Sequence, residues 1–360
     1  VYVYGMLSES RVYLRDDKRL ASYKQLFDER LGDLRRQADQ GDHERLLRVQ
    51  GVGADATGSG AGAGASAAAR NWGVSPLVIG LTIVAFGTSA PELIVSAVAA
   101  YRGNPGLAVG NAIGSNIANI GLILGVTALF TPLTVTSLTL RREMPALLAV
   151  SLLTVSLFLD TFLSRIDGIV MLTGLVIVMI WLARLGMRSA ANDPIAMDYE
   201  AEIPTDVSMP MAVVWLIIGL GTLLVGAELL VDGAIGIAKL MGVSEVVIGI
   251  TIVAFGTSLP ELAVSVASAI KGEYGLAIGN IVGSNIFNLL AVIGVAATLS
   301  PAALAPSVLS LHIFVMVAFT LVLFAMTYDY DGKAQLSRLE GLALFIAYIA
   351  YDGYVIAQNI

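Results

Sequence analysis

The sequence has no cysteine, and its 360 residues include only two histidines, His43 and His312. Without thiols there is no disulfide framework, no thiolate nucleophile, no zinc–thiolate site and no iron–sulfur cluster to consider. Charged residues are also scarce, since Asp, Glu, Lys and Arg make up 14% of the chain. These absences exclude most soluble-enzyme chemistry, so we expect no catalytic residue and no resident cofactor. The net charge of −7 gives no reason to expect nucleic acid as a partner.

Apolar residues dominate instead, with 56% of the chain hydrophobic and a mean hydropathy of +0.80. A water-soluble globular domain of this size neither needs nor tolerates such a balance. The charges are also concentrated, because residues 1–50 hold 19 of the 49 charged side chains. The composition predicts an integral membrane protein with a polar N-terminal segment. Its partner is then the lipid bilayer, and no obligate protein partner is implied.

The N-terminal segment, residues 1–50, has apolar residues at helical spacing among dense mixed charges, which predicts a soluble amphipathic helix. These apolar residues are Leu20, Tyr23, Phe27, Leu31 and Leu34. A cleavable signal peptide is not expected, because no charged region precedes an apolar one. Residues 51–72 are rich in Gly and Ala, which is typical of a flexible linker or of the remnant of a first transmembrane helix.

Beyond this point, apolar stretches of about 20 residues recur, each long enough to cross a bilayer as a helix. We expect nine spans, near 75–101, 106–130, 143–160, 166–186, 209–231, 243–270, 275–298, 308–327 and 339–357. The predicted fold class is an all-α membrane protein. The polar residues 187–208 separate a first transmembrane half, 73–186, from a second half, 209–360.

The distribution of basic residues predicts the orientation, because cytoplasmic loops carry an excess of Lys and Arg. One side receives Arg70, Arg141, Arg142, Arg184, Arg188, Lys271, Lys333 and Arg338, and the other receives Arg102, Arg165 and Lys239. We therefore expect the first span to run outward across a plasma (inner) membrane. With nine spans, the C-terminus would lie outside and the N-terminal segment in the cytoplasm.

The two halves contain an internal repeat. Residues 73–125 align with residues 242–294 without a gap, and about 30 of the 53 positions are identical. The core is GLTIVAFGTSAPEL against GITIVAFGTSLPEL, followed by LAVGNAIGSNIANIG against LAIGNIVGSNIFNLL. Since the two copies start on opposite sides in this topology, the repeats are expected to be inverted. Inverted repeats are typical of secondary transporters with a substrate site near the bilayer midplane.

Each repeat carries one glutamate, Glu92 or Glu261, about halfway along a predicted span. An ionised carboxylate at this depth costs on the order of 3 kcal/mol unless it is paired or hydrated. Neither repeat supplies a Lys or Arg at membrane depth. The missing partner is therefore expected to be a mobile cation, a proton or water, and two carboxylates suit one divalent cation or several monovalent ones.

The residues around the glutamates suit a hard cation. Pro91 and Pro260 are expected to break the helix just before each glutamate and to free backbone carbonyls. Carbonyl and hydroxyl oxygens are ligands that Ca²⁺ and Na⁺ accept. The expected carbonyls are those of Ala85, Thr88, Ala254 and Thr257, and the expected hydroxyls are those of Ser89 and Ser258. A polar helix face follows in each repeat, with Asn111, Ser115, Asn116, Asn119, Asn280, Ser284, Asn285 and Asn288.

The doubled GTSxPE segments, each followed by GNxxGSN, resemble the alpha repeats of the cation/calcium antiporter superfamily, in particular its sodium/calcium exchanger branch. The resemblance covers roughly residues 74–360. It implies ten helices in two inverted sets of five and exchange of Ca²⁺ against Na⁺ by alternating access. No cofactor is implied, because the two ions are substrates.

The resemblance also implies ligands, position by position. The central Ca²⁺ ligands would be Glu92 and Glu261 with the carbonyls of Thr88 and Thr257. The flanking Na⁺ sites would use Ala85, Ser89, Ser115, Ala254, Ser258 and Ser284, and Asn119 and Asn288 would complete the centre. Some members carry Asp at the position of Asn288, including potassium-dependent exchangers. The neutral asparagine weakens the case for potassium co-transport here.

Three alternatives remain. Proton/calcium antiporters of the same superfamily share the plan but usually present a different glutamate-bearing sequence. A cation channel would need a continuous pore, whereas here two halves of one chain complete one site. An intramembrane hydrolase would need an activated nucleophile, but Ser89 and Ser258 have no base besides the glutamates, and His312 is solitary.

One departure from the family concerns its first helix. The residues VGAE at 225–228 lie in the span that opens the second half, and VGAD at 52–55 matches them in the first half. The residues before Val52 are too charged to cross a bilayer, so the first helix is expected to be missing or replaced. A shifted reading frame, a gene-start artefact and a genuine soluble appendage would each produce this pattern.

Overall fold

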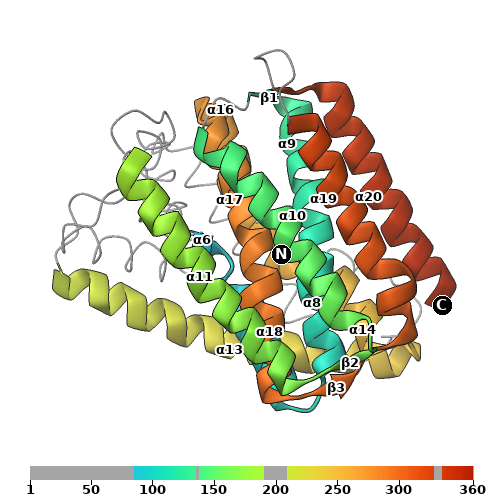
Figure 1. Cartoon of the computed structure of the whole chain (residues 1–360). Helices are drawn as coiled ribbons and strands as arrows, with labels where there is room; N and C mark the ends of the chain where they lie inside the picture. Colours follow the sequence, from blue (N-terminus) through green and yellow to red (C-terminus); the bar gives the residue numbers. More distant parts are fainter. Residues whose placement is uncertain (1–84, 135–137, 190–208, 328–334, 360) are drawn as a thin grey trace, which may run out of the picture. The chain divides into compact units, whose positions relative to one another are not determined.

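The structure is a computed structural model that describes residues 85–134, 138–189, 209–327 and 335–359 (Figure 1). The predicted N-terminal segment 1–50, the segment 51–72 and the beginning of the first predicted span lie outside the described residues. So does most of the predicted connection 187–208. Nothing in the described part bears on those expectations, so they remain predictions.

The described part of the first half is helical apart from two short strands. Its elements are α6 (Ala85–Thr88), α7 (Ala90–Tyr101), α8 (Pro105–Ala118), η3 (Asn119–Leu124), α9 (Gly125–Phe130), β1 (Leu133–Thr134), α10 (Leu138–Phe158), β2 (Phe162–Leu163) and α11 (Arg165–Ser189). The segment η3 is π-helical and continues α8 directly into α9. The result is one long helix from Pro105 to Phe130.

The second half repeats this order after one additional helix, α13 (Met209–Met241). Its other elements are α14 (Glu245–Ile248), η4 (Gly249–Val253), α15 (Ala254–Thr257), α16 (Leu259–Lys271), α17 (Tyr274–Phe287), η5 (Asn288–Val292), α18 (Ile293–Leu299), β3 (Ala302–Ala303), η6 (Val308–His312), α19 (Ile313–Thr327), β4 (Gln335–Leu336) and α20 (Arg338–Asn359). The segments η4, η5 and η6 are π-helical.

Two short strand pairs, here called ladders, determine the relative directions of the equivalent helices α10 and α19. Strand β1 pairs antiparallel with β4, and β2 pairs antiparallel with β3. Helix α10 leads from β1 to β2, whereas its equivalent α19 leads from β3 to β4. Because each ladder joins one end of both helices, α10 and α19 run in opposite directions. Figure 1 shows the two ladders at opposite ends of these helices.

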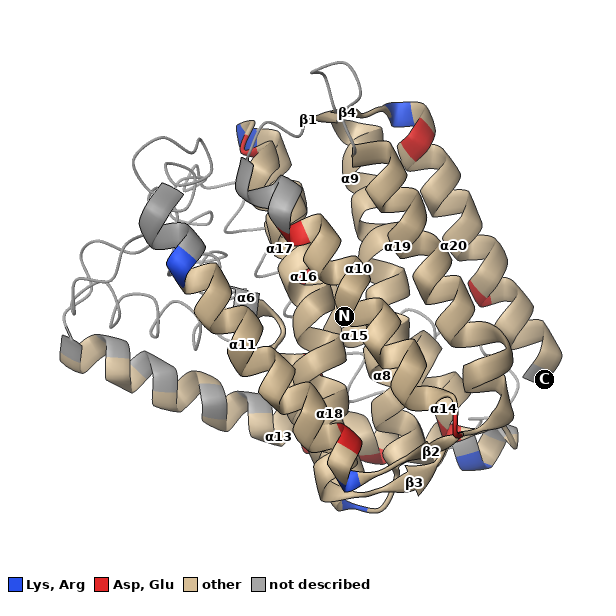
Figure 2. Cartoon of the chain, viewed as in Figure 1, with Lys and Arg blue, Asp and Glu red and all other residues tan. Residues whose placement is uncertain are grey.

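The helices are apolar enough for a membrane protein, but fewer qualify than the nine expected. Six described helices are long and apolar enough to cross a membrane, and the bent pair Glu245–Thr257 and Leu259–Lys271 would make seven. Two further expected spans correspond to the shorter apolar helices Ala90–Tyr101 and Glu143–Phe158. The count of nine spans therefore remains a prediction. Figure 2 shows that most of the described charged residues lie near helix ends.

Most expected boundaries agree with the structure to within a few residues, and the largest difference is at α13. This helix was expected to end near residue 231 but continues to Met241. Gly242 then adopts a φ of +69°, which glycine reaches without steric cost. The composition of residues 232–241 is compatible with either a connection or a helix. The end of α13 is therefore set by Gly242, which adopts the left-handed conformation.

Close approach between α8 and the α14–η4 segment places the two repeats in contact at the centre. A Cβ atom on Gly110 would lie 2.5 Å from the Val246 carbonyl oxygen, and one on Gly114 would lie 2.4 Å from the Ile250 carbonyl oxygen. Reciprocally, a Cβ on Gly249 would lie 2.6 Å from the Leu107 carbonyl oxygen. Glycine is therefore required at this crossing, as small residues are at close helix contacts in membranes.

Candidate ion-binding site

The two helix breaks are alike in the two repeats. Ser89 separates α6 from α7 with φ −87° and ψ 6°, and Ser258 separates α15 from α16 with φ −84° and ψ 6°. The second break bends the helix by 43°. Helical hydrogen bonding resumes when Leu93 N–H donates to the Ser89 carbonyl and Leu262 N–H donates to the Ser258 carbonyl, each at 3.1 Å.

The breaks lie slightly earlier than the sequence predicted. Pro91 and Pro260 were expected to end a helix just before the glutamates, but each occupies the first turn of the helix that follows the break. Proline is favoured there because the first turn does not use its missing N–H group. Glu92 and Glu261 consequently lie in the first turns of α7 and α16.

Each glutamate accepts a hydrogen bond from the serine at the break of the other repeat. Ser258 Oγ donates to Glu92 Oε1 at 3.2 Å, and Ser89 Oγ donates to Glu261 Oε1 at 3.1 Å. All four side chains are buried, and both carboxylates have no exposed surface. Neither glutamate forms an ion pair with a described Lys or Arg. Two buried carboxylates are thus held together by neutral groups alone.

Four buried oxygens of the predicted ligand residues have no hydrogen-bond partner among the described residues. They are Glu92 Oε2, Glu261 Oε2, Asn119 Oδ1 and Asn288 Oδ1. A buried acceptor without a donor is costly, so such groups are normally paired. Unpaired carboxylate and amide oxygens match the chemistry of a hard cation, which supplies positive charge and no hydrogen-bonding groups of its own.

The remaining candidate hydroxyls lie in the same cluster. Ser284 Oγ donates to Glu261 Oε1 at 3.3 Å and lies 3.4 Å from Thr88 Oγ1. In the other repeat, Ser115 Oγ lies 3.5 Å from Thr257 Oγ1. The threonines end the arms that precede the breaks, α6 and α15, and the serines lie on α8 and α17. The structure therefore brings both threonines and all four serines of the predicted set to the two glutamates.

The asparagines divide into different environments. Asn119 Nδ2 donates to Asn285 Oδ1 at 2.9 Å, whereas both amide atoms of Asn288 are buried without a partner among the described residues. Asn116 and Asn285 each donate from Nδ2 to the other's backbone carbonyl, at 3.2 and 3.4 Å. Asn116 and Asn285 thus join α8 to α17, and Asn119 and Asn288 begin the π-helical segments η3 and η5.

The two predicted alanine carbonyls are less clearly placed. Ala254 keeps a helical bond, because its carbonyl accepts from Ser258 N–H at 3.1 Å, and it also lies 3.4 Å from Thr257 Oγ1. The break at Ser258 therefore does not free this carbonyl in the conformation described here. Ala85 begins α6, and its side chain lies outside the described residues.

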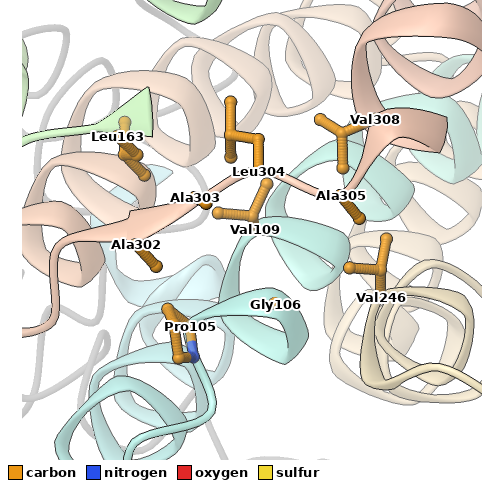
Figure 3. A pocket seen from close by; sticks show the side chains of 10 residues that line it. All are labelled: Pro105, Gly106, Val109, Leu163, Val246, Ala302, Ala303, Leu304, Ala305 and Val308. Carbon is orange, nitrogen blue, oxygen red and sulfur yellow. The ribbon is translucent and has the colours of Figure 1, made fainter. Parts of the chain in front are cut away.

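A hollow at one end of the bundle lies apart from this cluster. Its walls are apolar side chains from the beginnings of α8, α14 and η6 and from the two strands β2 and β3 (Figure 3). The lining residues are Pro105, Gly106, Val109, Leu163, Val246, Ala302, Ala303, Leu304, Ala305 and Val308. None of them offers a charged group or a side-chain oxygen, so this hollow is unsuited to a cation.

Two features of the described structure were not expected from the sequence. Arg102 forms ion pairs with Glu228 and Asp232, which tie the end of α7 to α13. Ser96 and Ser265 bind side chains of the polar helix faces. Their spacing is the signal that could have identified them, because each lies four residues after a glutamate and therefore on the same helix face.

The chain matches known proteins over most of its length. The family model described as "Sodium/calcium exchanger protein" matches residues 56–185 and 211–357. The putative antiporter CaxA of Alkalimonas amylolytica is 46% identical over 284 residues, which cover 79% of this chain and 89% of that protein. The inner membrane protein YrbG of Escherichia coli K12 is 42% identical over 255 residues, which cover 70% and 78%.

A solved structure of the sodium-calcium exchanger NCX_Mj, soaked with Na⁺ and Sr²⁺, is similar in fold and sequence. The TM-score is 0.60 and the identity 36%, over 84% of this chain and 94% of that one. Exchangers of this kind transport ions without a cofactor and are not enzymes. The matched length of this chain, its repeats and its buried carboxylates all support one conclusion. The chain belongs to the sodium/calcium exchanger protein family of antiporters and is an integral, multi-pass membrane protein.

Proposed function

We propose that the protein exchanges Ca²⁺ for Na⁺ across the membrane by alternating access at one site built around Glu92 and Glu261. The observation that carries this proposal is the reciprocal arrangement of the two carboxylates. Each is fully buried, each is bonded to a serine of the other repeat, and each has one oxygen without a partner among the described residues. Such a pair is stable in a membrane only when cations or protons compensate it.

The proposed ligands are those expected from the sequence. Glu92, Glu261 and the carbonyls of Thr88 and Thr257 would bind Ca²⁺, with Asn119 and Asn288 completing the centre. The flanking Na⁺ sites would use Ala85, Ser89, Ser115, Ala254, Ser258 and Ser284. The convergence of the two threonines and the four serines on the two glutamates supports the set. For Ala254, whose carbonyl accepts a hydrogen bond from Ser258 N–H in this conformation, ligation requires a small rearrangement at Ser258.

The same site can serve both sides of the membrane if the two halves are inverted repeats. The opposite directions of α10 and α19 support this arrangement, as do the reciprocal bonds at the breaks. Nine spans in the matched region would place the two copies of the repeat in opposite orientations. In inverted-repeat transporters, rocking of one half against the other then exposes the midplane site to each side in turn.

Exchange follows from competition for one anionic centre. Ca²⁺ and a set of Na⁺ ions would use overlapping oxygens, so that binding of one expels the other. Only a centre with compensated charge can be closed off from water without a large desolvation cost. The site therefore changes slowly between facing the two sides of the membrane when it is empty, so transport of one ion depends on return of the other. Sodium is favoured over protons because hydroxyls and neutral amides surround the carboxylates.

The experiment is Ca²⁺ transport by purified protein in proteoliposomes, with Glu92→Gln and Glu261→Gln compared with the parent. Each substitution removes half of the central charge, so each is expected to reduce Ca²⁺ flux by a factor of about 100, or about 3 kcal/mol. Glu340→Gln is the matched control, since Glu340 accepts bonds from Ser337 at the start of α20 and glutamine keeps an acceptor oxygen. Parent-like flux in either site variant would exclude the two-glutamate centre.

A further inference from the structure

Two asparagines of the polar helix faces have an environment different from that of the proposed ligands. Asn111 and Asn280 are equivalent positions of the two repeats, and both are buried. Each has partners for both ends of its side-chain amide, whereas Asn288 has none among the described residues. Asn111 and Asn280 therefore act through other residues rather than as free oxygens.

The first chain of hydrogen bonds begins in the second half and ends in the first. Thr257 Oγ1 donates to Asn111 Oδ1 at 3.0 Å, and Asn111 Nδ2 donates to Ser96 Oγ at 3.0 Å. Ser96 Oγ then donates to the backbone carbonyl of Ala108 at 3.5 Å. Asn111 Nδ2 also lies 3.4 Å from the backbone carbonyl of Glu92. These hydrogen bonds thus connect α15, the helix before the break at Ser258, to α7, the helix of the other half that carries Glu92.

The second chain is its equivalent with the halves exchanged. Thr88 Oγ1 donates to Asn280 Oδ1 at 3.2 Å, and Asn280 Nδ2 donates to Ser265 Oγ at 3.4 Å. Ser265 Oγ donates to the backbone carbonyl of Ala277 at 3.4 Å. The side chains of all the residues that donate in the two chains are buried. Because the same arrangement of hydrogen bonds occurs in both halves, an accidental contact does not explain it.

The direction of these bonds has a consequence for the threonines. When the threonine hydroxyl gives its proton to the asparagine oxygen, the hydroxyl lone pairs remain available to a cation and its proton does not oppose one. The same bond fixes the last residue before the break, whose carbonyl the proposed function assigns to Ca²⁺. Pre-organised ligands bind more tightly, because less ordering is needed on binding.

We propose that Asn111 and Asn280 are positioning residues, each of which holds the threonine of the opposite half in the geometry that binds Ca²⁺. This inference rests on the proposed function, since it assigns these residues a role at the same site. It adds that each half of the ion site is held in place by the polar helix of the other half.

The test is a double-mutant cycle with equilibrium binding of ⁴⁵Ca to the purified full chain. Thr257→Val and Asn111→Leu are nearly isosteric and remove the two partners of one bond. Loss of one such hydrogen bond should weaken Ca²⁺ binding about fivefold in each single variant. Because both changes break the same bond, the double variant should also be weakened about fivefold, and not about twenty-five-fold.

The matched control combines Thr257→Val with Asn280→Leu, which belong to different chains of bonds and should weaken binding about twenty-five-fold together. Thr257→Ser, which keeps the hydroxyl, should recover most of the affinity lost in Thr257→Val. In exchange assays, the variants should raise the half-saturating Ca²⁺ concentration more than they lower the maximal rate. A structural defect alone would not change the half-saturating Ca²⁺ concentration more than the maximal rate, and it would not be corrected by serine at position 257.

The outcomes separate this inference from the proposed function. A parent that binds no Ca²⁺ would overturn both. A parent that binds Ca²⁺, with equal additivity in the two double variants, would overturn only the positioning role. Failure of Thr257→Ser to recover affinity would also overturn it, because the methyl group and not the hydroxyl would then matter.

Discussion

Ser89 of the first half donates a hydrogen bond to Glu261 of the second half, with 3.1 Å between Oγ and Oε1. The equivalent bond from Ser258 to Glu92 runs in the reverse sense at 3.2 Å. Neither half therefore contains a complete carboxylate site. This exchange of partners explains why the repeat retains both a glutamate and a serine, since each copy supplies one partner to the other.

Calcium should stabilise the folded protein through the two glutamates. A ligand that binds only the folded state at 100 times its Kd contributes about 2.7 kcal/mol. We expect the melting temperature of detergent-solubilised protein to rise with Ca²⁺ and to fall back when a chelator removes it. Glu92→Gln and Glu261→Gln should lose this rise, whereas Glu340→Gln should keep it. An equal rise in all four proteins would place Ca²⁺ binding elsewhere.

The substitution Asn288→Asp tests whether Asn288 belongs to the site. Its amide has no described partner, so aspartate adds a negative charge without removing a hydrogen bond. The added charge should attract a further cation and change Na⁺ competition, or bring a dependence on K⁺ or pH that the parent lacks. Exchange measured against each ion would detect this.

The control for the added charge is Asn104→Asp, because Asn104 precedes α8 and its side chain donates to the backbone carbonyl of Arg102 and not to a proposed ligand residue. It should leave the ion dependence as in the parent. If Asn288→Asp did the same in a well-expressed protein, Asn288 would lie outside the ligand shell.

Cysteine labelling can test the inverted repeat directly, because the chain has no cysteine of its own. Tyr101 and Ile270 are equivalent positions near the ends of α7 and α16, and both side chains are largely exposed. An impermeant maleimide should label Tyr101→Cys in right-side-out vesicles and Ile270→Cys only in inside-out vesicles. Labelling of both from the same side would contradict inversion.

The crossing of α8 with η4 should not tolerate a side chain at Gly114. A Cβ there would lie 2.6 Å from the Ile250 Cα atom and 2.4 Å from the Ile250 carbonyl oxygen, so backbone would have to move. Gly114→Ala should lower the free energy of unfolding by about 1–3 kcal/mol. Gly353→Ala is the control, since a Cβ at Gly353 meets nothing within 4 Å. Equal melting temperatures for the two variants would contradict this packing.

The sequence predicted those features that depend on composition and on the repeat. The expected span 308–327 coincides with η6 and α19, because its apolar run ends where polar residues begin. The structure also groups Glu92 and Glu261 with the four serines, since two near-identical motifs on related halves converge if the halves pack together. That these residues bind ions is our proposal.

Other features depend on geometry that residue patterns do not encode. The π-helical segments at Asn119 and Asn288 keep the apolar pattern of an α-helix, so no change of period announces them. The position of the breaks at Ser89 and Ser258 depends on how proline fits the first turn of the next helix. The bonds of Asn111 to Thr257 and of Asn280 to Thr88 join residues that only the packing of two halves brings together.

The most direct test of the central claim is ⁴⁵Ca uptake by proteoliposomes that contain the purified parent protein and are loaded with Na⁺. The pH gradient is collapsed with a protonophore, so that sodium is the remaining driving ion. Sodium/calcium exchange predicts uptake that follows the outward Na⁺ gradient and stops when this gradient is abolished. Uptake that is indifferent to Na⁺ but follows an imposed proton gradient would contradict it and assign the protein to H⁺/Ca²⁺ antiport.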